Sequence, residues 1–196
     1  MEDDYDSEFA YGAKPLPALQ SLDRFGRVIY VGSFSKTLAP GLRLGYLIVP
    51  AHLAEAFRIA RLVTTLGGTR YVQATLADFV AEGHFARHVR RMTRSYAERR
   101  RALLQVLEAG LPTPRFRVGF GNVGLHVAVL AADPDFDDAA VTAALRPAGI
   151  HVEPLSSMCV ARTDCRGFMV GYSAAPAGDI ERAALALVRA IAKGLN

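Results

Sequence analysis

The segment from Val28 to Pro50 constrains the fold most strongly, because two short apolar runs in it flank one polar loop. The runs, Val28–Val31 and Leu44–Val49, have the length of strands, and a continuous apolar run is typical of a strand buried on both faces. The polar loop between the runs carries Ser33, Ser35, Lys36 and Arg43. We therefore predict that Lys36 follows a core strand, at a place with little water.

These side chains indicate a particular chemistry. Burial lowers the pKa of a lysine amine, and the neutral amine is the form that attacks a carbonyl carbon. Ser33 and Arg43 add hydroxyl and guanidinium donors that suit a phosphate. A nucleophilic lysine beside an anion site is what a phosphate-bearing aldehyde cofactor requires.

Composition excludes several classes of protein. With 51% hydrophobic and 21% charged residues, the chain is expected to fold around a core, and a net charge of +4 does not by itself indicate nucleic-acid binding. Cys159 and Cys165 lack the second cysteine pair of a metal framework. The acidic start, Met1–Asp6, is unlike a secretory or mitochondrial presequence, and no apolar run reaches the length of a membrane span. We expect a cytoplasmic protein that does not enter a membrane.

Strand-like and helix-like patterns alternate along the chain, which places it in the α/β or α+β class. Glu2–Phe9 has the pattern of a strand end and its exit loop. Helices are predicted over 53–63, over 71–108 with a break near Gly83, over 137–145 with Asp137 as the cap, and over 179–193. Further strands are predicted over 116–118, 124–130, 151–154 and 168–172.

Three motifs resemble known families. Ser33–Tyr46, Ser-Phe-Ser-Lys-Thr-Leu-Ala-Pro-Gly-Leu-Arg-Leu-Gly-Tyr, resembles the cofactor-lysine motif of fold-type I aminotransferases, which use pyridoxal 5′-phosphate. Glu2–Phe9 and Glu82–Met92 resemble segments of MocR-type proteins of the GntR family, which fuse a winged-helix DNA reader to an aminotransferase-like domain. The resemblance implies an α/β fold, with the end of a fold-type I large domain in 1–100 and a small α+β C-terminal domain in 101–196.

The same resemblance implies a role for each residue of the site. Lys36 would hold pyridoxal phosphate as a Schiff base and then move a proton on the substrate carbon. Asp3 would face the pyridine nitrogen and Tyr5 the phenolic oxygen of the cofactor. Ser33, Ser35 and Arg43 would bind its phosphate. Three alternatives remain open: Asp4 in place of Asp3, a turn-capping role for Ser35, and Lys14 as the lysine.

Two departures from the aminotransferase pattern bear on function. Met169 stands where aminotransferases place the arginine that grips the substrate carboxylate, and Arg162 or Arg166, in the loop before it, could replace that arginine, although nothing in the sequence requires it. The glycine-rich phosphate loop, the ring-stacking aromatic residue and an asparagine lie upstream of the acidic motif in the family. We expect the remaining walls of the pocket to come from a partner chain or from a longer protein.

The function predicted from the resemblance is that of a pyridoxal-phosphate-binding, aminotransferase-like domain of a MocR-type transcriptional regulator. It would act as a homodimer on a small-molecule amino donor or effector, with DNA bound only through an upstream module that this sequence lacks. One alternative is a genuine amino-acid transaminase. Another is a non-catalytic or ligand-sensing domain that binds no cofactor.

One helical stretch supports two other hypotheses. Arg87–Arg101 holds seven arginines, several near one stripe that could track phosphates, although a solvated linking helix explains the pattern as well. His84 and His88 have the i, i+4 spacing of a two-histidine metal site. The arginines around this pair would repel a cation, so we expect a solvated or interface pair.

Overall fold

The computed structural model describes residues 1–12, 16–65, 69–119, 122–162 and 164–194. The chain forms two compact units, Met1–Thr93 (unit 1) and Arg94–Asn196 (unit 2). The assignment of 1–100 to a large cofactor domain stays a prediction. Over the described residues, no helix combines the length and the apolar character that crossing a membrane requires.

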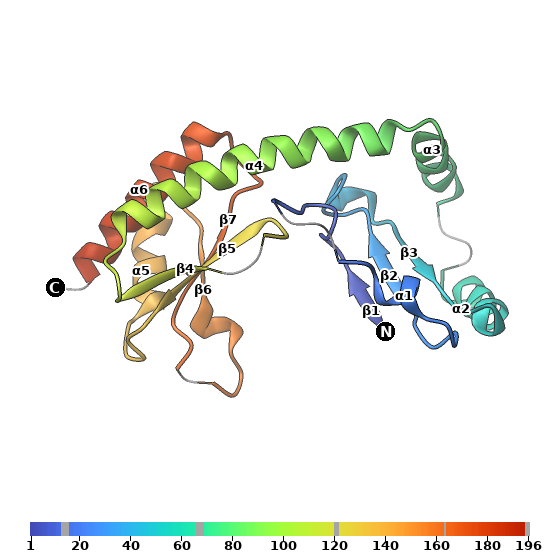
Figure 1. The fold of residues 1–196 in the computed structure, drawn as a ribbon, viewed down its shortest axis with the longest axis horizontal. Helices are drawn as coiled ribbons and strands as arrows, with labels where there is room; N and C mark the ends of the chain where they lie inside the picture. Colours follow the sequence, from blue (N-terminus) through green and yellow to red (C-terminus); the bar gives the residue numbers. More distant parts are fainter. Residues whose placement is uncertain (13–15, 66–68, 120–121, 163, 195–196) are drawn as a thin grey trace. The chain divides into compact units, whose positions relative to one another are not determined.

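Unit 1 is built on a three-stranded sheet with the order β1-β2-β3 (Figure 1). Its strands are β1 (Glu2–Asp4), β2 (Tyr30–Ser33) and β3 (Gly45–Ile48). Strand β1 runs parallel to β2, with Asp3 opposite Val31, and β3 runs antiparallel to β2, with Ser33 opposite Gly45. The predicted strand end in the acidic motif is confirmed, and the first apolar run forms its strand two residues later than predicted.

Helices flank the strands of unit 1, and the predicted helices over 53–63 and 71–108 are among them. They are α1 (Leu19–Leu22), the 3₁₀ turns η1 (Pro40–Leu42) and η2 (Ala51–Leu53), α2 (Ala54–Thr65), α3 (Arg70–Ala81) and the start of α4 (His84–Gly110). Gly83 separates α3 from α4 with a φ of 75°, a left-handed backbone that glycine adopts at little cost. The predicted break near Gly83 is therefore confirmed.

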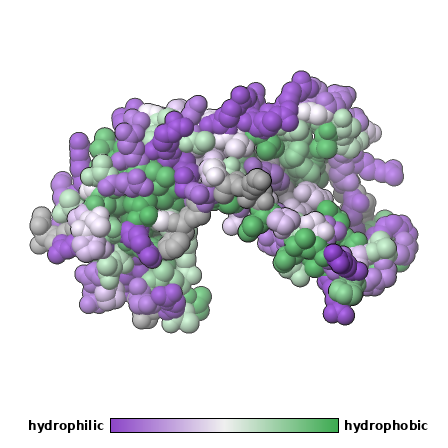
Figure 2. All heavy atoms as spheres, viewed as in Figure 1, coloured by the Kyte–Doolittle hydropathy of each residue, from purple (hydrophilic) through white to green (hydrophobic). Residues whose placement is uncertain are grey.

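The prediction that both apolar runs are buried on both faces is wrong for β3. All four of its residues are exposed, and Leu47 and Ile48 keep 50% and 43% of their surface accessible. Figure 2 shows apolar side chains open on unit 1, near its strands and α2. An apolar run predicts that a strand becomes covered, but Leu47 and Ile48 remain about half exposed.

Unit 2 is a two-layer α/β sandwich. Its sheet has the order β4-β5-β7-β6, and every neighbouring pair is antiparallel. The strands are β4 (Phe116–Gly119), β5 (His126–Ala131), β6 (Glu153–Pro154) and β7 (Gly167–Gly171). Val127 pairs with Val170 and Val129 with Phe168, so these four buried side chains share one face of the sheet.

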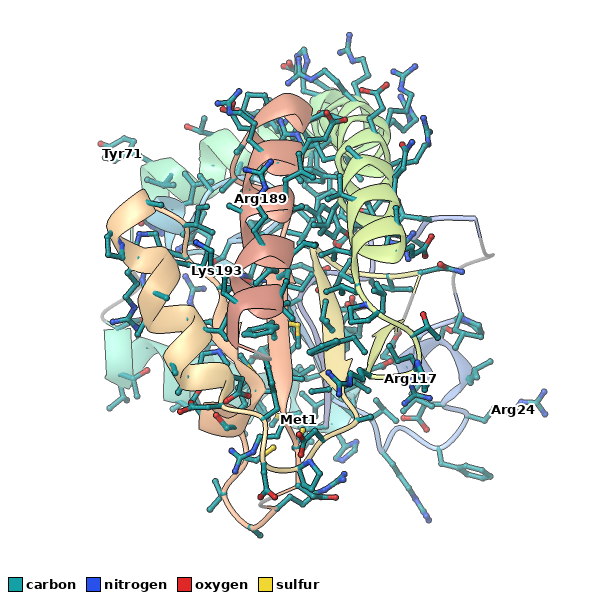
Figure 3. The ribbon with its side chains drawn as sticks, turned by 90° about the vertical axis from the view of Figure 1, so that its left-hand side faces the viewer. Met1, Arg24, Tyr71, Arg117, Arg189 and Lys193 are labelled. Atoms are coloured by element: carbon teal, nitrogen blue, oxygen red, sulfur yellow. The ribbon has the colours of Figure 1, made fainter. Side chains whose placement is uncertain are left out.

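Helices cover that buried face. The C-terminal part of α4, with α5 (Asp138–Leu145) and α6 (Ala177–Gly194), lies in one layer against the sheet (Figures 1 and 3). On α6, Ile180, Ala184, Leu187 and Ile191 are buried at helical spacing, and Val188 is half-buried. The Asp137 carboxylate accepts a hydrogen bond from the Ala140 amide at 2.8 Å, which confirms the predicted cap of α5.

Candidate functional site

One edge of the unit 1 sheet brings the predicted site residues near one another. Because β1 and β2 are parallel, their carboxyl ends, Asp4 and Ser33, lie at the same edge. Because β3 is antiparallel to β2, it begins at that edge with Gly45 opposite Ser33. At this edge, Tyr5 follows the end of β1, and Ser35 and Lys36 follow the end of β2. Arg43 precedes the start of β3.

The strand register also separates two faces. Side chains alternate along a strand, and directly paired residues point to the same side. Asp3 pairs with Val31, and Ser33 follows two residues later, so Asp3, Val31 and Ser33 share one face. Asp4 and Tyr30 share the opposite face.

The segment Phe34–Leu38, called here the lysine turn, is held by local backbone contacts. The Phe34 amide donates to the Leu44 carbonyl at 3.1 Å, and the Leu38 amide donates to the Phe34 carbonyl at 2.8 Å. The Ser33 hydroxyl oxygen accepts a hydrogen bond from the Ser35 amide at 3.1 Å. Ser33 therefore caps the turn, and its own O–H remains a donor.

The prediction that Lys36 has little water around it is wrong, because its side chain is exposed. The buried residue of the turn is its neighbour Thr37, which keeps 2% of its surface accessible. The strand that precedes the turn is covered less than an apolar run suggests, which explains the difference. The rival Lys14 lies outside the described residues.

Arg43 has a left-handed backbone, with a φ of 52°. It follows the turn η1, and its amide donates to the Pro40 carbonyl at 3.2 Å. A non-glycine residue pays about 1 kcal/mol or more for this conformation, and such residues often occur where a side chain must point in one direction. The Arg43 guanidinium is exposed at the same sheet edge as Ser33.

The neighbouring acidic residues have structural partners. The Asp4 carboxylate accepts hydrogen bonds from the Ser7 hydroxyl at 2.6 Å and from the Tyr30 hydroxyl at 2.8 Å. Partial burial acts to raise the pKa of Asp4, but the hydrogen bonds from Ser7 and Tyr30 outweigh it and lower the pKa. Burial and the bond to Asp4 raise the pKa of Tyr30. Glu2 accepts from the amides of Leu19 and Gln20, at 2.8 and 3.0 Å.

Asp3 and Tyr5, in contrast, are exposed, and Tyr5 keeps 51% of its surface accessible. The two adjacent aspartates thus have different surroundings. Asp4 is hydrogen-bonded within unit 1, and Asp3 is exposed on the face that carries Ser33. The sequence pattern did not reveal the Asp4–Tyr30 pair, because its members are 26 residues apart.

A groove of about 1230 Å³ adjoins this edge. Its walls come from β2, β3, α2 and α3, and they include Val31, Phe34, Arg43 and Leu47. A second hollow, of about 330 Å³, lies in unit 2 between α4 and β4 and is lined by none of the predicted site residues. The groove in unit 1 is therefore the hollow that accompanies the candidate site.

The possible replacements for the missing substrate arginine are engaged elsewhere in unit 2. Met169 lies in β7, between Ala128 and Glu153 on the neighbouring strands. The Arg162 guanidinium pairs with Asp164 at 2.8 Å, and the Arg166 Nε donates to the Pro134 carbonyl at 2.8 Å. Both arginines thus have local partners.

The histidine pair on α4 does not form a metal site. The His84 ring contacts Glu82 at 3.1 Å, and the His88 ring contacts the Thr37 carbonyl at 2.9 Å. Among the described residues, no three His, Cys, Asp or Glu side chains gather as metal ligands would. The two histidines therefore have separate roles.

Comparisons with known proteins identify the family of this chain. The family model of aminotransferase class I and II matches residues 3–184. The probable rhizopine catabolism regulatory protein MocR of Rhizobium meliloti is 38% identical over 88% of this chain and 35% of its own length. The transcriptional regulator TauR of Rhodobacter capsulatus is 38% identical over 79% of this chain and 31% of its own length. The chain thus spans about a third of the length of these curated relatives.

Solved structures show the same fold. The multiple substrate aminotransferase of Thermococcus profundus superposes with a TM-score of 0.88 at 27% identity, over 99% of this chain and 48% of that chain. The kynurenine aminotransferase of Pyrococcus horikoshii superposes with a TM-score of 0.87 at 26% identity, over 100% of this chain and 48% of that chain. The fold is that of fold-type I aminotransferases, and MocR-type regulators are among the relatives. The chain belongs to the aminotransferase class I and II family.

Proposed function

We propose that this chain supplies the lysine-bearing wall of a pyridoxal 5′-phosphate site. The observation that carries the proposal is the common sheet edge, where the parallel β1–β2 pair and the antiparallel β2–β3 pair bring Asp3, Ser33 and Arg43 near the lysine turn. These groups offer a carboxylate, a hydroxyl and a guanidinium around one amine. That donor set fits a cofactor with a pyridine nitrogen, a phosphate and an aldehyde.

Each residue then has a defined task. Lys36 would hold the cofactor through its aldehyde carbon, with release of water, and as a free amine it would move a proton at the substrate carbon. The Asp3 carboxylate would keep the pyridine nitrogen protonated, and the Tyr5 hydroxyl would donate to the phenolic oxygen. Ser33, Ser35 and Arg43 would bind the phosphate. When bound, the cofactor supplies an electron sink for the bonds of the substrate carbon.

The surroundings of Met169 support a regulatory use of this chemistry. An arginine that grips a carboxylate with two hydrogen bonds fixes an amino-acid substrate for turnover. This position holds a methionine, and Arg162 and Arg166 have local partners. We therefore propose the ligand-responsive domain of a MocR-type transcriptional regulator. It would be a cytoplasmic homodimer whose DNA contacts lie in another module, with a small amino compound as its effector.

Cofactor binding and turnover can be tested separately on the full-length protein. Titration with pyridoxal phosphate should produce an absorbance band near that of a protein-bound imine, and borohydride should make the binding permanent. A panel of amino acids should then shift the band without converting the cofactor to its amine form. Absence of the band would contradict the proposed site, whereas full conversion in a single turnover would identify a genuine transaminase.

A further inference from the structure

The lysine turn is held from the side of helix α4 as well as by its own hydrogen bonds. The Phe34 ring packs edge-on against the Phe85 ring, with centroids 5.7 Å apart. One helical turn later, the His88 Nε2 lies 2.9 Å from the backbone carbonyl oxygen of Thr37. Phe85 and His88 thus contact the first part of the turn and the residue that directly follows Lys36.

The two partners of His88 define its tautomer. A carbonyl oxygen only accepts hydrogen bonds, so Nε2 must carry the proton that it donates to Thr37. The Arg91 guanidinium only donates, and it lies 3.3 Å from Nδ1 of His88, so that nitrogen must be unprotonated. The half-buried ring therefore directs its Nε2–H at the lysine turn, with Nδ1 facing Arg91.

We propose that His88 is a positioning residue for Lys36: its Nε2–H fixes the Thr37 carbonyl and thereby the direction in which the lysine leaves the turn. The inference rests on the proposed function, because it assigns His88 a purpose in the cofactor site. It also gives a use to the Glu82–Met92 motif, in which the i, i+4 histidine spacing suggested a metal pair. His88 acts through the backbone and is not itself a catalytic residue.

The exposure of Lys36 explains why such a support matters. Little packs around its side chain, so its direction depends mainly on the backbone conformation of the turn. A shift of about 1 Å in a reacting group can lower a rate about a hundredfold. The Thr37 side chain adds little to the direction of the turn, since its buried hydroxyl has no hydrogen-bond partner among the described residues. The carbonyl–imidazole bond is the polar contact that joins this part of the turn to α4.

The test compares substitutions at His88 with the same substitutions at His84 in the full-length protein. A glutamine amide reaches about as far as Nε2 and can donate to the Thr37 carbonyl, whereas alanine cannot. His84 is the matched control, because it lies on the same helix, is exposed, and contacts Glu82 and Arg87 rather than the turn. For each variant, we would measure the rate at which pyridoxal phosphate and borohydride label Lys36, and also the hydrogen exchange of residues 34–38 without cofactor.

His88→Ala should slow the labelling of Lys36 by about tenfold to a hundredfold and speed exchange in the turn. His88→Gln should restore most of the rate, and both substitutions at His84 should leave it within about twofold of the wild type. Faster exchange with an unchanged labelling rate in His88→Ala would reduce His88 to a structural role and overturn the inference. If the wild type itself takes no label, the proposed function fails, and unchanged exchange in His88→Ala would then overturn the anchoring contact separately.

Discussion

Arg43 combines a left-handed backbone with the charge that the proposed phosphate site requires. Asparagine adopts this backbone readily, so Arg43→Asn removes the guanidinium without adding strain. A hydrogen bond to a charged group contributes about 1.5–3 kcal/mol, so the dissociation constant of pyridoxal phosphate should rise at least about tenfold. An absorbance titration measures this change.

The control for Arg43 is pyridoxal, which lacks the phosphate. Its affinity should differ between wild type and Arg43→Asn by no more than about twofold, because the guanidinium has no phosphate to contact. Equal losses for both compounds would show that the substitution disturbs the fold. Unchanged affinity for the phosphorylated compound would remove Arg43 from the site.

The Asp4–Tyr30 hydrogen bond predicts a dependence of stability on acid. Since the folded-state pKa of Asp4 lies below its unfolded value of about 3.9, this stabilisation is present above pH 4 and is lost as the pH falls through the folded-state pKa. Tyr30→Phe removes one of the bonds that lower the pKa. The difference in unfolding free energy between wild type and Tyr30→Phe should therefore shrink below pH 4. Urea unfolding from pH 7 to pH 3 tests this, and a constant difference would refute it.

Because the hydroxyl of Thr37 is buried, we expect that a substitution which removes it does not lower the stability of the protein. The hydroxyl has no partner among the described residues, so no hydrogen bond within the protein replaces the hydrogen bonds to water that it loses on folding. Thr37→Val keeps the shape of the side chain, and we expect the free energy of unfolding to stay equal or to rise by up to about 1 kcal/mol. Urea denaturation measures it; a clear loss of stability would show that the hydroxyl is hydrogen-bonded.

At the scale of elements, the start of α5 connects three parts of unit 2. The Asp138 carboxylate is 1% exposed and accepts hydrogen bonds from the Ser156 amide, the Ser156 hydroxyl and the Gly167 amide, at 3.0, 2.5 and 3.0 Å. Gly167 approaches so closely that a Cβ there would lie 1.9 Å from the Val129 carbonyl oxygen. One buried carboxylate thus joins α5 to the segments on either side of the loop before β7.

Asp137 and Asp138 therefore make a matched pair for measurement. Asp137→Ala loses one exposed cap bond and should cost about 1 kcal/mol of unfolding free energy. Asp138→Ala leaves buried donors without a partner and should cost about 3 kcal/mol or more. Urea unfolding of both variants checks the order, and equal losses would contradict the connecting role of Asp138.

Helices were more predictable from the sequence than strand burial. The periodicity of α6, the break at Gly83 and the cap at Asp137 are local signals, and the structure confirms all three. The burial of β3 depends on what lies over it, and an apolar run carries no information about that neighbour. The predicted strand over 151–154 is reduced to Glu153–Pro154 for a similar reason, since only these two residues pair with β7.

For the candidate site, the sequence motifs indicated the residue types but not their supports. The spacing from Ser33 to Arg43 is local, so it could be recognised in the sequence as a cofactor-lysine motif. The exposure of Lys36 could not be predicted from the sequence, because it depends on the residues that pack around the turn. The contact from His88 to Thr37 spans 51 positions, and the contact from Tyr30 to Asp4 spans 26. Such supports become visible only once the strands and α4 are in place.

For the molecule as a whole, the exposed apolar surface predicts that these 196 residues, expressed alone, bind a hydrophobic dye. The open side chains of β3 form part of a groove of about 1230 Å³, and large exposed apolar patches mark interaction surfaces. We expect this chain alone to bind a hydrophobic dye such as ANS, and Leu47→Lys to reduce the fluorescence. Equal fluorescence in both proteins would contradict the exposure of this face.

The proposed cofactor site depends on the amine of Lys36, one of the chain's three lysines, Lys14, Lys36 and Lys193. Lys193 lies exposed on α6 (Figure 3) and serves as an internal reference. The full-length protein is incubated with pyridoxal phosphate, reduced with borohydride, digested and analysed by mass spectrometry, beside a Lys36→Arg variant. We expect a phosphopyridoxyl group on Lys36, little on Lys193, and none at residue 36 of the variant. Equal labelling of Lys193 and Lys36, or no label on Lys36 at all, would contradict the proposed site.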